Sequence, residues 1–400
     1  MVLTYRIEEM PWLKPQVPLV MKCPAIYVQG PDASKDTGKY CGHLGKKAFL
    51  IGGSTAMKMA KENIAASLAS VGVEVAGTES RANICTDREN SRILEAAKAS
   101  ECNFVIGVGG GSVADIARVV AGKLGQDLVM VGTVASMAGH TSALSVIYND
   151  DATWNRYDLF PEDTHAVIID SKIVADAPVE QLVNGMGDAM CIKFEMEASK
   201  KAEAVTLVGG YPTVTSMLIA RECWNQLREF GLQAIAANKK HVVTYALERI
   251  IETNTLMAGV GFESGGLAGG HGIHDGLVGA GLIALHKSAK AHKPHGQVIS
   301  FTTITQMVME DRPSAEIMEA IAWAESVGLS TTFKDLLGKD PDPEVLWDGA
   351  KKSCMRDKVL LWGATPVSPG RVYAAMISAD QLGHEYKEKL KWESTAPGKR

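Results

Sequence analysis

Histidines and one aspartate give this sequence the residue types from which proteins build metal centres. His271 and His274 lie three residues apart in FESGGLAGGHGIHDGL, so one helical turn would place both on the same side. His292 and His295 follow in HKPHGQVISF, and Asp188 lies in NGMGDAMC, where we expect it at the start of a helix. Imidazole and carboxylate ligands that leave one coordination position open are typical of catalytic metal ions. Taken singly, Asp188 fits an acid at a helix N-terminus and each histidine fits a core or surface residue. Their grouping favours a metal site.

The first of these segments also holds six glycines in sixteen residues. Glycine destabilises helices and strands, so a run this dense needs a local reason. We expect Gly265, Gly266, Gly269 and Gly270 to let the backbone pack closely at a cleft, where His271 reaches a metal ion.

A second glycine cluster, GVGGGSVAD, begins at Gly107. It follows the apolar run FVI and precedes a helical pattern, which indicates a strand, a turn and a helix. Gly109, Gly110, Gly111 and Ser112 would then present free N–H groups to a phosphate at the helix N-terminus. The spacing differs from GxGxxG, and the GK[ST] of an ATP-hydrolysing P-loop is absent. The cluster predicts a phosphate site, with a purely structural turn as the alternative.

Short apolar runs alternate with helical patterns through the first half of the chain. We expect strands in 46–53, 73–77, 102–112, 127–136 and 165–170, with helices at 54–70, 91–101 and 113–125 between them. This alternation predicts a mostly parallel, Rossmann-like sheet. From about residue 177 nearly every segment has helical period. We therefore expect an α/β domain over 1–176 and an all-α domain over 177–400.

Composition narrows the class of protein. A chain of 400 residues favours two domains, and 46% hydrophobic with 22% charged residues is ordinary for a globular protein. The net charge of -5 argues against a nucleic-acid partner. Seven scattered cysteines without a CxxC pair suit reduced thiols, and the sequence shows neither a signal peptide nor a membrane-spanning apolar run. We expect a cytoplasmic metabolic enzyme, with a binding protein of similar composition as the alternative.

In combination, these motifs resemble the glycerol dehydrogenase branch of the iron- or zinc-dependent alcohol dehydrogenase superfamily. The motifs run in the order GGGS-x-x-D, TSALSVIY, GMGDAM, FESGGLAGGHGIHDG and HGQVISF, and the resemblance extends from about residue 24 to beyond 310. It implies a dehydroquinate synthase-like architecture, in which a metal ion lies between a nucleotide-binding α/β domain and a helical domain. It also implies hydride transfer between NAD or NADP and a small alcohol, diol or polyol. We expect a homo-oligomer, because the helical domain offers ample surface for one.

Matching motifs imply roles for individual residues. Asp188, His271 and His295 resemble the three metal ligands. His274 resembles a nearby histidine that lies behind the ligands or faces the substrate, and that could help proton transfer. The positions that match cofactor contacts are Gly53, Ser54, Gly109, Gly110, Gly111, Ser112, Asp115, Thr133, Ser136, Ser142, Leu144, Val146 and Tyr148. Ala138 and Phe262 match substrate contacts.

Departures from the branch concern the metal and the substrate. The iron-dependent members resemble D-x-x-x-H, whereas the fourth residue after Asp188 is Ile192, so three protein ligands favour Zn²⁺ over Fe²⁺. The glycerol dehydrogenases resemble ASTDAPT where this chain has ASMAGHT. Ala138 replaces an aspartate near the substrate, and Met137 and His140 also differ, which favours a substrate other than glycerol.

A further departure concerns the cofactor. NAD-using members resemble a strand that ends in an aspartate for the ribose hydroxyls, and Gly53 takes that place here. Without the acid, repulsion against a 2′-phosphate is lost, and Ser54, Thr55 or Lys58 could contact that phosphate. The sequence therefore predicts that NADP is accepted, with NAD binding through backbone and water as the alternative.

Two other functions remain open. Glycerol-1-phosphate dehydrogenase and 3-dehydroquinate synthase share the plan, but their phosphorylated substrates require clustered Lys and Arg, which 262–286 lacks. Lys287, Lys290 and Lys293 follow that range, within a long segment that also holds His286 and His292 and predicts an altered substrate rim. The second alternative is a non-catalytic nucleotide-binding protein on the same fold.

Overall fold

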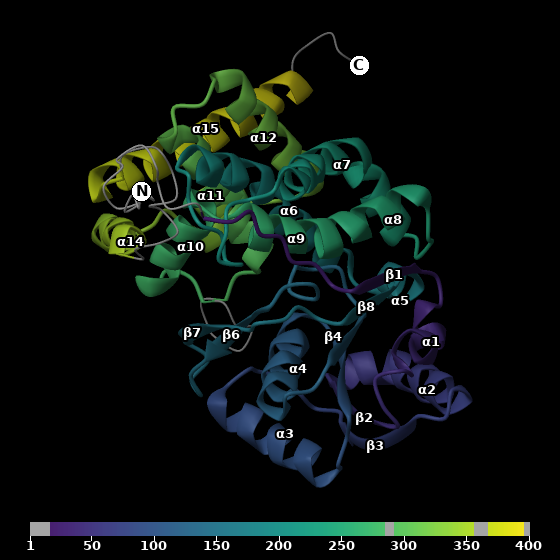
Figure 1. Ribbon diagram of the computed structural model, residues 1–400. Helices are drawn as coiled ribbons and strands as arrows, with labels where there is room; N and C mark the ends of the chain where they lie inside the picture. Colours follow the sequence, from purple (N-terminus) through teal and green to yellow (C-terminus); the bar gives the residue numbers. More distant parts are fainter. Residues whose placement is uncertain (1–16, 285–291, 356–366, 396–400) are drawn as a thin grey trace, which may run out of the picture.

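The computed structural model describes residues 17–284, 292–355 and 367–395. A parallel six-stranded sheet with its helices forms one part of the molecule. A helical part lies against the loops at one end of this sheet (Figure 1). The strands lie in the order β1-β8-β5-β4-β2-β3. Their bounds are β1 Ile26–Gly30, β2 Lys47–Gly52, β3 Glu74–Glu79, β4 Phe104–Gly109, β5 Leu128–Gly132 and β8 Ala166–Asp170.

Helices cover both faces of this sheet. They are the 3-10 turn η2 (Ala33–Asp36), α1 (Thr37–Cys41), α2 (Ser54–Ser70), α3 (Asp87–Ala99), α4 (Gly111–Leu124) and α5 (Ser171–Asp176). Alternate residues of the strands divide between two cores, as the period of two in a strand requires. Phe49 and Ile51 pack with α3 and α4, whereas Ala48 and Leu50 pack with α1 and α2. The expected Rossmann-like fold is therefore present.

Local signals set the ends of these helices. The Thr86 side chain accepts a hydrogen bond from Glu89 N and begins α3, and Asp170 caps α5 in the same manner. At α4 the cap is Gly110, which has no side chain to offer, so the first N–H groups of that helix remain available.

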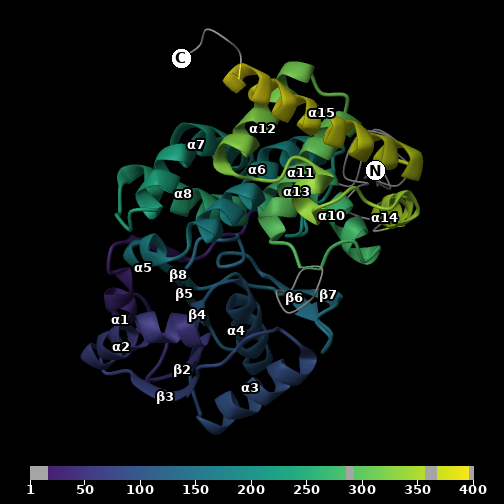
Figure 2. The same cartoon turned by 180° about the vertical axis from the view of Figure 1, so that it is seen from behind.

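The sequence patterns located five strands correctly and missed three. β1 forms the edge of the sheet beside β8. It was missed because it is a segment of only five residues between Pro24 and Pro31, too short to be recognised as an apolar run. β6 (Leu144–Tyr148) and β7 (Trp154–Leu159) form a separate antiparallel hairpin. The hairpin lies below α10 in both Figure 1 and Figure 2, which view the molecule from opposite sides.

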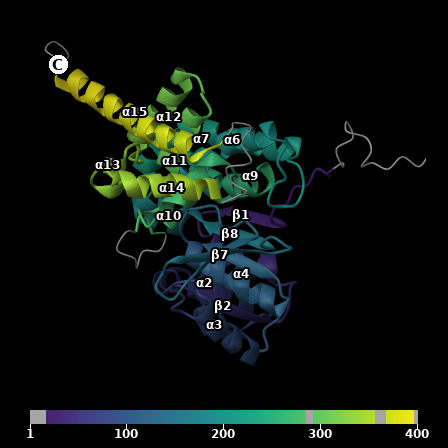
Figure 3. The same ribbon diagram turned by 90° about the vertical axis from the view of Figure 1, so that its left-hand side faces the viewer.

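Every element described from α6 onward is helical. These are α6 (Val179–Lys201), α7 (Val214–Asn238), α8 (Tyr245–Glu252), the π-helical turn η3 (Thr253–Met257), α9 (Ala258–Gly265), α10 (Gly269–Gly279), α11 (His295–Met309), α12 (Ser314–Val327), α13 (Phe333–Leu337), α14 (Pro343–Met355) and α15 (Pro369–Thr395). α14 and α15 pack against each other at the outside of this part (Figure 3). The boundary near residue 176 stays a prediction. Residues 19–22 already contact the helical part, through a Leu19–Tyr211 bridge and a hydrogen bond from Lys22 N to Ser264 Oγ.

Asp188 does not begin a helix, contrary to expectation. It lies in the middle of α6, which starts after Pro178. Gly185 and Gly187 do not interrupt the helix. Their lack of a side chain instead lets neighbouring segments approach α6 closely. A Cβ on Gly185 would lie 2.1 Å from Ala135 O, and one on Gly187 would lie 2.2 Å from Gly296 O. These contacts bring α6 against the loop after β5 and against the start of α11.

Candidate active site at the domain cleft

A cavity of about 570 Å³ separates the two parts of the molecule. Its lining includes Gly111 and Ser112 at the start of α4 and, from the helical part, Asp188, His271 and His295. The remaining lining residues are Asp115, Ser136, Met137, Ala138, Gly139, Ser142, Leu144, Val146, Tyr148, Tyr157, Leu159, Gln181, Asn184, Ile192, Leu207, Phe262, Leu267, His274, Asp275, His292 and Pro294. The cavity therefore joins a glycine turn to a histidine cluster.

The three expected metal ligands converge from three helices. Ligand atoms of Asp188 (α6), His271 (α10) and His295 (α11) all lie within 4.8 Å of one another. Nε2 of His295 is 3.2 Å from Oδ1 of Asp188, and the backbone N–H of Ala138 donates to Oδ2 of Asp188 at 3.3 Å. Burial opposes the charge on Asp188, but His295 and His271 outweigh it and lower the pKa of that carboxyl. The site thus presents an ionised oxygen ligand beside two imidazoles.

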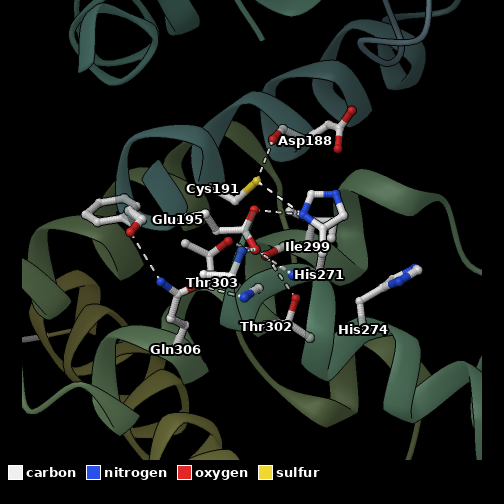
Figure 4. Close-up of polar contacts among 12 residues, drawn as sticks. Asp188, Cys191, Glu195, His271, His274, Ile299, Thr302, Thr303 and Gln306 are labelled. Carbon is white, nitrogen blue, oxygen red and sulfur yellow. Dashed lines mark hydrogen bonds and ion pairs between the residues drawn. The ribbon is translucent and has the colours of Figure 1, made fainter. Parts of the chain in front are cut away.

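His271 packs against Glu195 and Cys191 of α6. Its Nδ1 lies 2.7 Å from Oε2 of Glu195, a wholly buried carboxylate, and 3.9 Å from Sγ of Cys191 (Figure 4). Burial alone would lower the pKa of His271, but the pairing with Glu195 raises it to about 9. Its other ring nitrogen, Nε2, is left for the cluster formed with Asp188 and His295.

His274 contacts the nitrogen of His295 that faces away from Asp188. Nε2 of His274 lies 3.1 Å from Nδ1 of His295, and Nδ1 of His274 lies 3.1 Å from Oδ1 of Asp275. The Tyr157 hydroxyl donates to the same Asp275 oxygen at 2.9 Å, which links the β6–β7 hairpin to α10. Burial lowers the pKa of His274 to about 4, so the ring is neutral at pH 7. A carboxylate only accepts, so His274 donates to Asp275 from Nδ1 and accepts from His295 at Nε2.

The glycine turn lies at the carboxyl ends of neighbouring parallel strands. β2 and β4 pair side by side, and the chain passes from β2 to the edge strand β3 before it returns to β4. Such a reversal of strand order opens a crevice in which α/β sheets bind nucleotides. Gly109 has φ +154, and a Cβ on Gly110 would lie 2.8 Å from Val134, so both positions require glycine.

Other expected cofactor positions fall into two groups. Ser136, Ser142, Leu144, Val146 and Tyr148 line the cavity. Gly53, Ser54, Gly109, Gly110 and Thr133 lie outside its lining, the first two at the start of α2. Asp115 borders the cavity but is buried beside Arg118, 3.9 Å away, and burial raises its pKa to about 7. The role of Asp115 as a cofactor contact stays a prediction.

Sequence patterns missed several polar residues of the site. Glu195 lies seven residues after Asp188, which places it two turns farther along the same face of α6. The spacing was available in the sequence, because the helix expected from Asp188 onward already includes Glu195. Asn184 and Gln181 line the cavity one and two turns before Asp188. Tyr157 was not recognised as a site residue, because the β6–β7 hairpin that carries it was not expected.

The segment between His274 and His295 is only partly described. His292 lines the cavity, and its Nδ1 lies 3.3 Å from Ala284 O. His286, Lys287 and Lys290 lie outside the described residues. None of the helices that the structure describes is long and apolar enough to cross a membrane.

Fold and site together define a class of two-domain protein that combines a parallel sheet of the kind that binds nucleotides with a histidine–carboxylate cluster. Comparison with known proteins supplies the family. Residues 28–178 match the model of the iron-containing alcohol dehydrogenases. A glycerol dehydrogenase of Escherichia coli O6:H1 is 36% identical over 94% of this chain and 99% of its own length. A glycolaldehyde reductase of Halobacterium salinarum is 33% identical over 92% of this chain and 99% of its own length.

The structural comparison agrees. The crystal structure of glycerol dehydrogenase from Schizosaccharomyces pombe has a TM-score of 0.87 and 26% identity, with 94% of each chain covered. This chain therefore belongs to the iron-containing alcohol dehydrogenase family, in its glycerol dehydrogenase branch.

Proposed function

We propose that this chain is a metal-dependent oxidoreductase that transfers a hydride between a nicotinamide cofactor and a small alcohol or polyol. The observation that carries the proposal is one cavity lined both by Gly111 and Ser112 of the glycine turn and by the Asp188–His271–His295 cluster. The relatives named glycerol dehydrogenase support the same reaction class.

The donor set fits a divalent metal ion. Asp188, His271 and His295 would hold it, because their ligand atoms converge and both histidines have Nδ1 engaged elsewhere. Two imidazoles and one carboxylate are the ligands of many catalytic zinc sites, and Ile192 supplies no ligand one turn after Asp188, so we favour Zn²⁺ over Fe²⁺. A zinc ion supplies Lewis-acid polarisation of a substrate oxygen.

The chain's own residues orient the reactants and limit water. Phe262, Leu267 and Ile192 give the cavity apolar walls beside the cluster. Asp188 is held in place by the Ala138 N–H. Because both ring nitrogens of His274 have partners, its contacts favour orientation of His295, and we propose that the substrate proton leaves through water.

For the cofactor, we propose that NADP is accepted alongside NAD. A Cβ on Gly53 would meet nothing closer than Ala82 O at 3.7 Å, so packing does not exclude an acid here. Ser54, Thr55 and Lys58 are exposed on the first turn and a half of α2, where a 2′-phosphate would find donors. Ser142 Oγ is buried without a hydrogen-bond partner among the described residues, which suits a cofactor contact inside the cavity.

A phosphorylated substrate has less support. No Lys or Arg is found among the described residues that line the cavity. An anionic substrate would normally need such side chains. A homo-oligomer and a cytoplasmic location stay predictions, the first to be tested by sedimentation of the purified protein.

The test is nicotinamide reduction over a panel of diols, polyols and mono-alcohols, each with NAD and with NADP. Turnover of at least one alcohol supports the proposal, and the better cofactor decides the Gly53 argument. A protein that binds dinucleotide but turns over no alcohol would overturn it and favour a phosphorylated substrate or a non-catalytic role.

A further inference from the structure

Glu195 is a buried carboxylate that faces the start of α10. Its side chain is 0% exposed, and it extends from α6 on the same face as Asp188. Oε1 accepts hydrogen bonds from the backbone N–H groups of His271, at 2.8 Å, and Ala268, at 3.1 Å. Ala268 is the N-cap of α10 and has no side-chain acceptor of its own. Glu195 therefore supplies, from another helix, the cap that the sequence of α10 lacks.

The second oxygen of Glu195 contacts the ring of the same histidine. Oε2 lies 2.7 Å from Nδ1 of His271. Because a carboxylate oxygen only accepts, Nδ1 is the donor and carries the hydrogen. When the ring loses its second hydrogen to act as a metal ligand, its lone pair is confined to Nε2, the nitrogen left for the cluster with Asp188 and His295. One side chain thus fixes the backbone, the ring orientation and the tautomer of His271.

The glycines of this segment make that contact possible. A Cβ on Gly270 would lie 3.0 Å from Oε1 of Glu195, and one on Gly269 would lie 2.9 Å from Cγ of Gln306. The N–H of Gly270 donates to Oε1 of Gln306 at 2.7 Å. Figure 4 shows Glu195, Gln306 and His271 gathered at the start of α10. Gly269 and Gly270 keep the helix terminus close enough to α6 and α11 for both side chains to reach it.

We infer that Glu195 is a positioning residue for the metal site, which holds His271 as an Nε2 ligand by accepting from its Nδ1–H and from its backbone N–H. The inference rests on the proposed metal-dependent function. Carboxylates behind ligating histidines commonly set ring orientation and metal affinity. Cys191 borders the same ring at 3.9 Å but, as a weak donor, cannot replace the carboxylate.

The test measures zinc affinity of the full chain by competition with a chromophoric chelator at pH 7.5. Glu195→Gln preserves the size of the side chain, but its amide presents N–H donors either to the ring or to the two backbone N–H groups. Gln306→Met is the control at the same helix end. It removes the acceptor of Gly270 N and the Gln306 donors to Phe194 O and Glu310, without touching the ring. Asp188→Asn, a change in a metal ligand, gives the reference for loss of the site.

We expect Glu195→Gln to weaken zinc binding roughly 10- to 100-fold, while Gln306→Met changes it less than about threefold. In cobalt-loaded protein, the visible spectrum should change with Glu195→Gln and not with Gln306→Met. Wild-type zinc affinity in Glu195→Gln, or equal losses in both variants, would overturn the inference. Equal losses would mean that only the placement of α10 matters.

A measurement on the wild type keeps the inference testable if Glu195→Gln fails to fold. Long-range ¹H–¹⁵N spectra of the zinc-loaded protein should show the hydrogen of His271 on Nδ1. A hydrogen on Nε2 would overturn the inference. Failure of the wild type to bind zinc, or binding that Asp188→Asn leaves intact, would instead overturn the proposed function.

Discussion

Gly53 has room for a side chain, so its identity bears on what is bound more than on how the protein packs. We predict that Gly53→Asp lowers kcat/KM with NADP roughly tenfold or more relative to that with NAD, because the new carboxylate repels a 2′-phosphate. Initial rates with both cofactors measure the ratio. Gly53→Asn is the control of equal shape without charge, and an equal shift with Asn would contradict the electrostatic explanation.

Ala138 lies beside Asp188 and is 4% exposed. We predict that Ala138→Asp raises kcat/KM for glycerol relative to a mono-alcohol of similar size by about tenfold, because the carboxylate accepts from an additional hydroxyl. Competition between the two substrates in one reaction measures this ratio. An unchanged ratio, or the same gain with Ala138→Leu, would show that the position does not select hydroxyl groups.

His140 is fully buried, and its Nε2 lies 3.0 Å from the carbonyl oxygen of Gly109. Burial lowers the pKa of His140, so the folded state holds a neutral ring while the unfolded chain takes up a proton below about pH 6.5. The contribution of His140 to stability is therefore complete above pH 6.5 and is lost as the pH falls through that value towards the lower folded pKa.

We predict that His140→Gln, which can donate to the same carbonyl without titrating, loses less stability than the wild type between pH 7.5 and 5. Denaturant unfolding at each pH measures the difference. Parallel pH profiles for the two proteins would contradict the assignment of a neutral, buried His140.

The residues that the family resemblance implies as metal ligands do lie together. The spacing of His271 and His274 on one helix did not by itself select them. Glu195, Asp275 and Tyr157 were not foreseen. Their importance arises from contacts with His271 and His274 that depend on how α6, α10 and β7 pack. The sequence spacing places Glu195 on the same helix face as Asp188, but its contact with His271 and the contacts of Asp275 and Tyr157 depend on packing between elements.

α10 shows how an element depends on its neighbours. Gly270 faces Glu195, whereas a Cβ on Gly279 would meet only the flexible side chain of Lys352, at 3.4 Å. We predict that Gly270→Ala destabilises the protein by roughly 1–3 kcal/mol through overpacking and also weakens zinc binding. Gly279→Ala, on the same helix, should be neutral or stabilise it by up to about 1 kcal/mol.

Thermal unfolding with and without zinc measures both variants. A neutral Gly270→Ala with unchanged zinc affinity would show that the start of α10 does not need its close approach to α6.

Strands β2, β4, β5 and β8 could be predicted because their residues are nearly all buried and form continuous apolar runs. The continuity of α6 through Gly185 and Gly187 could not be predicted. Gly185 and Gly187 look like helix breakers in a sequence, and only the positions of Ala135 and Gly296 reveal that they permit close packing.

Across the whole molecule, contacts between the two parts hold the cavity open in a defined shape. Asn254 Nδ2 donates to Ala135 O at 2.9 Å, and Thr141 Oγ1 donates to Thr255 O at 2.8 Å. On the opposite side, Tyr157 reaches Asp275 from the hairpin. The proposed metal ligands come from the helical part and the glycine turn from the sheet, so the proposed reaction requires both.

The measurement that tests this account most directly is nicotinamide reduction before chelation, after chelation and after zinc is restored, in the wild type and in Asp188→Asn. We predict that the chelated wild type loses turnover and regains it with zinc, while Asp188→Asn is inactive in all three states. Full turnover by a wild-type protein shown to be free of metal would contradict the central claim that Asp188, His271 and His295 form the active site's metal centre.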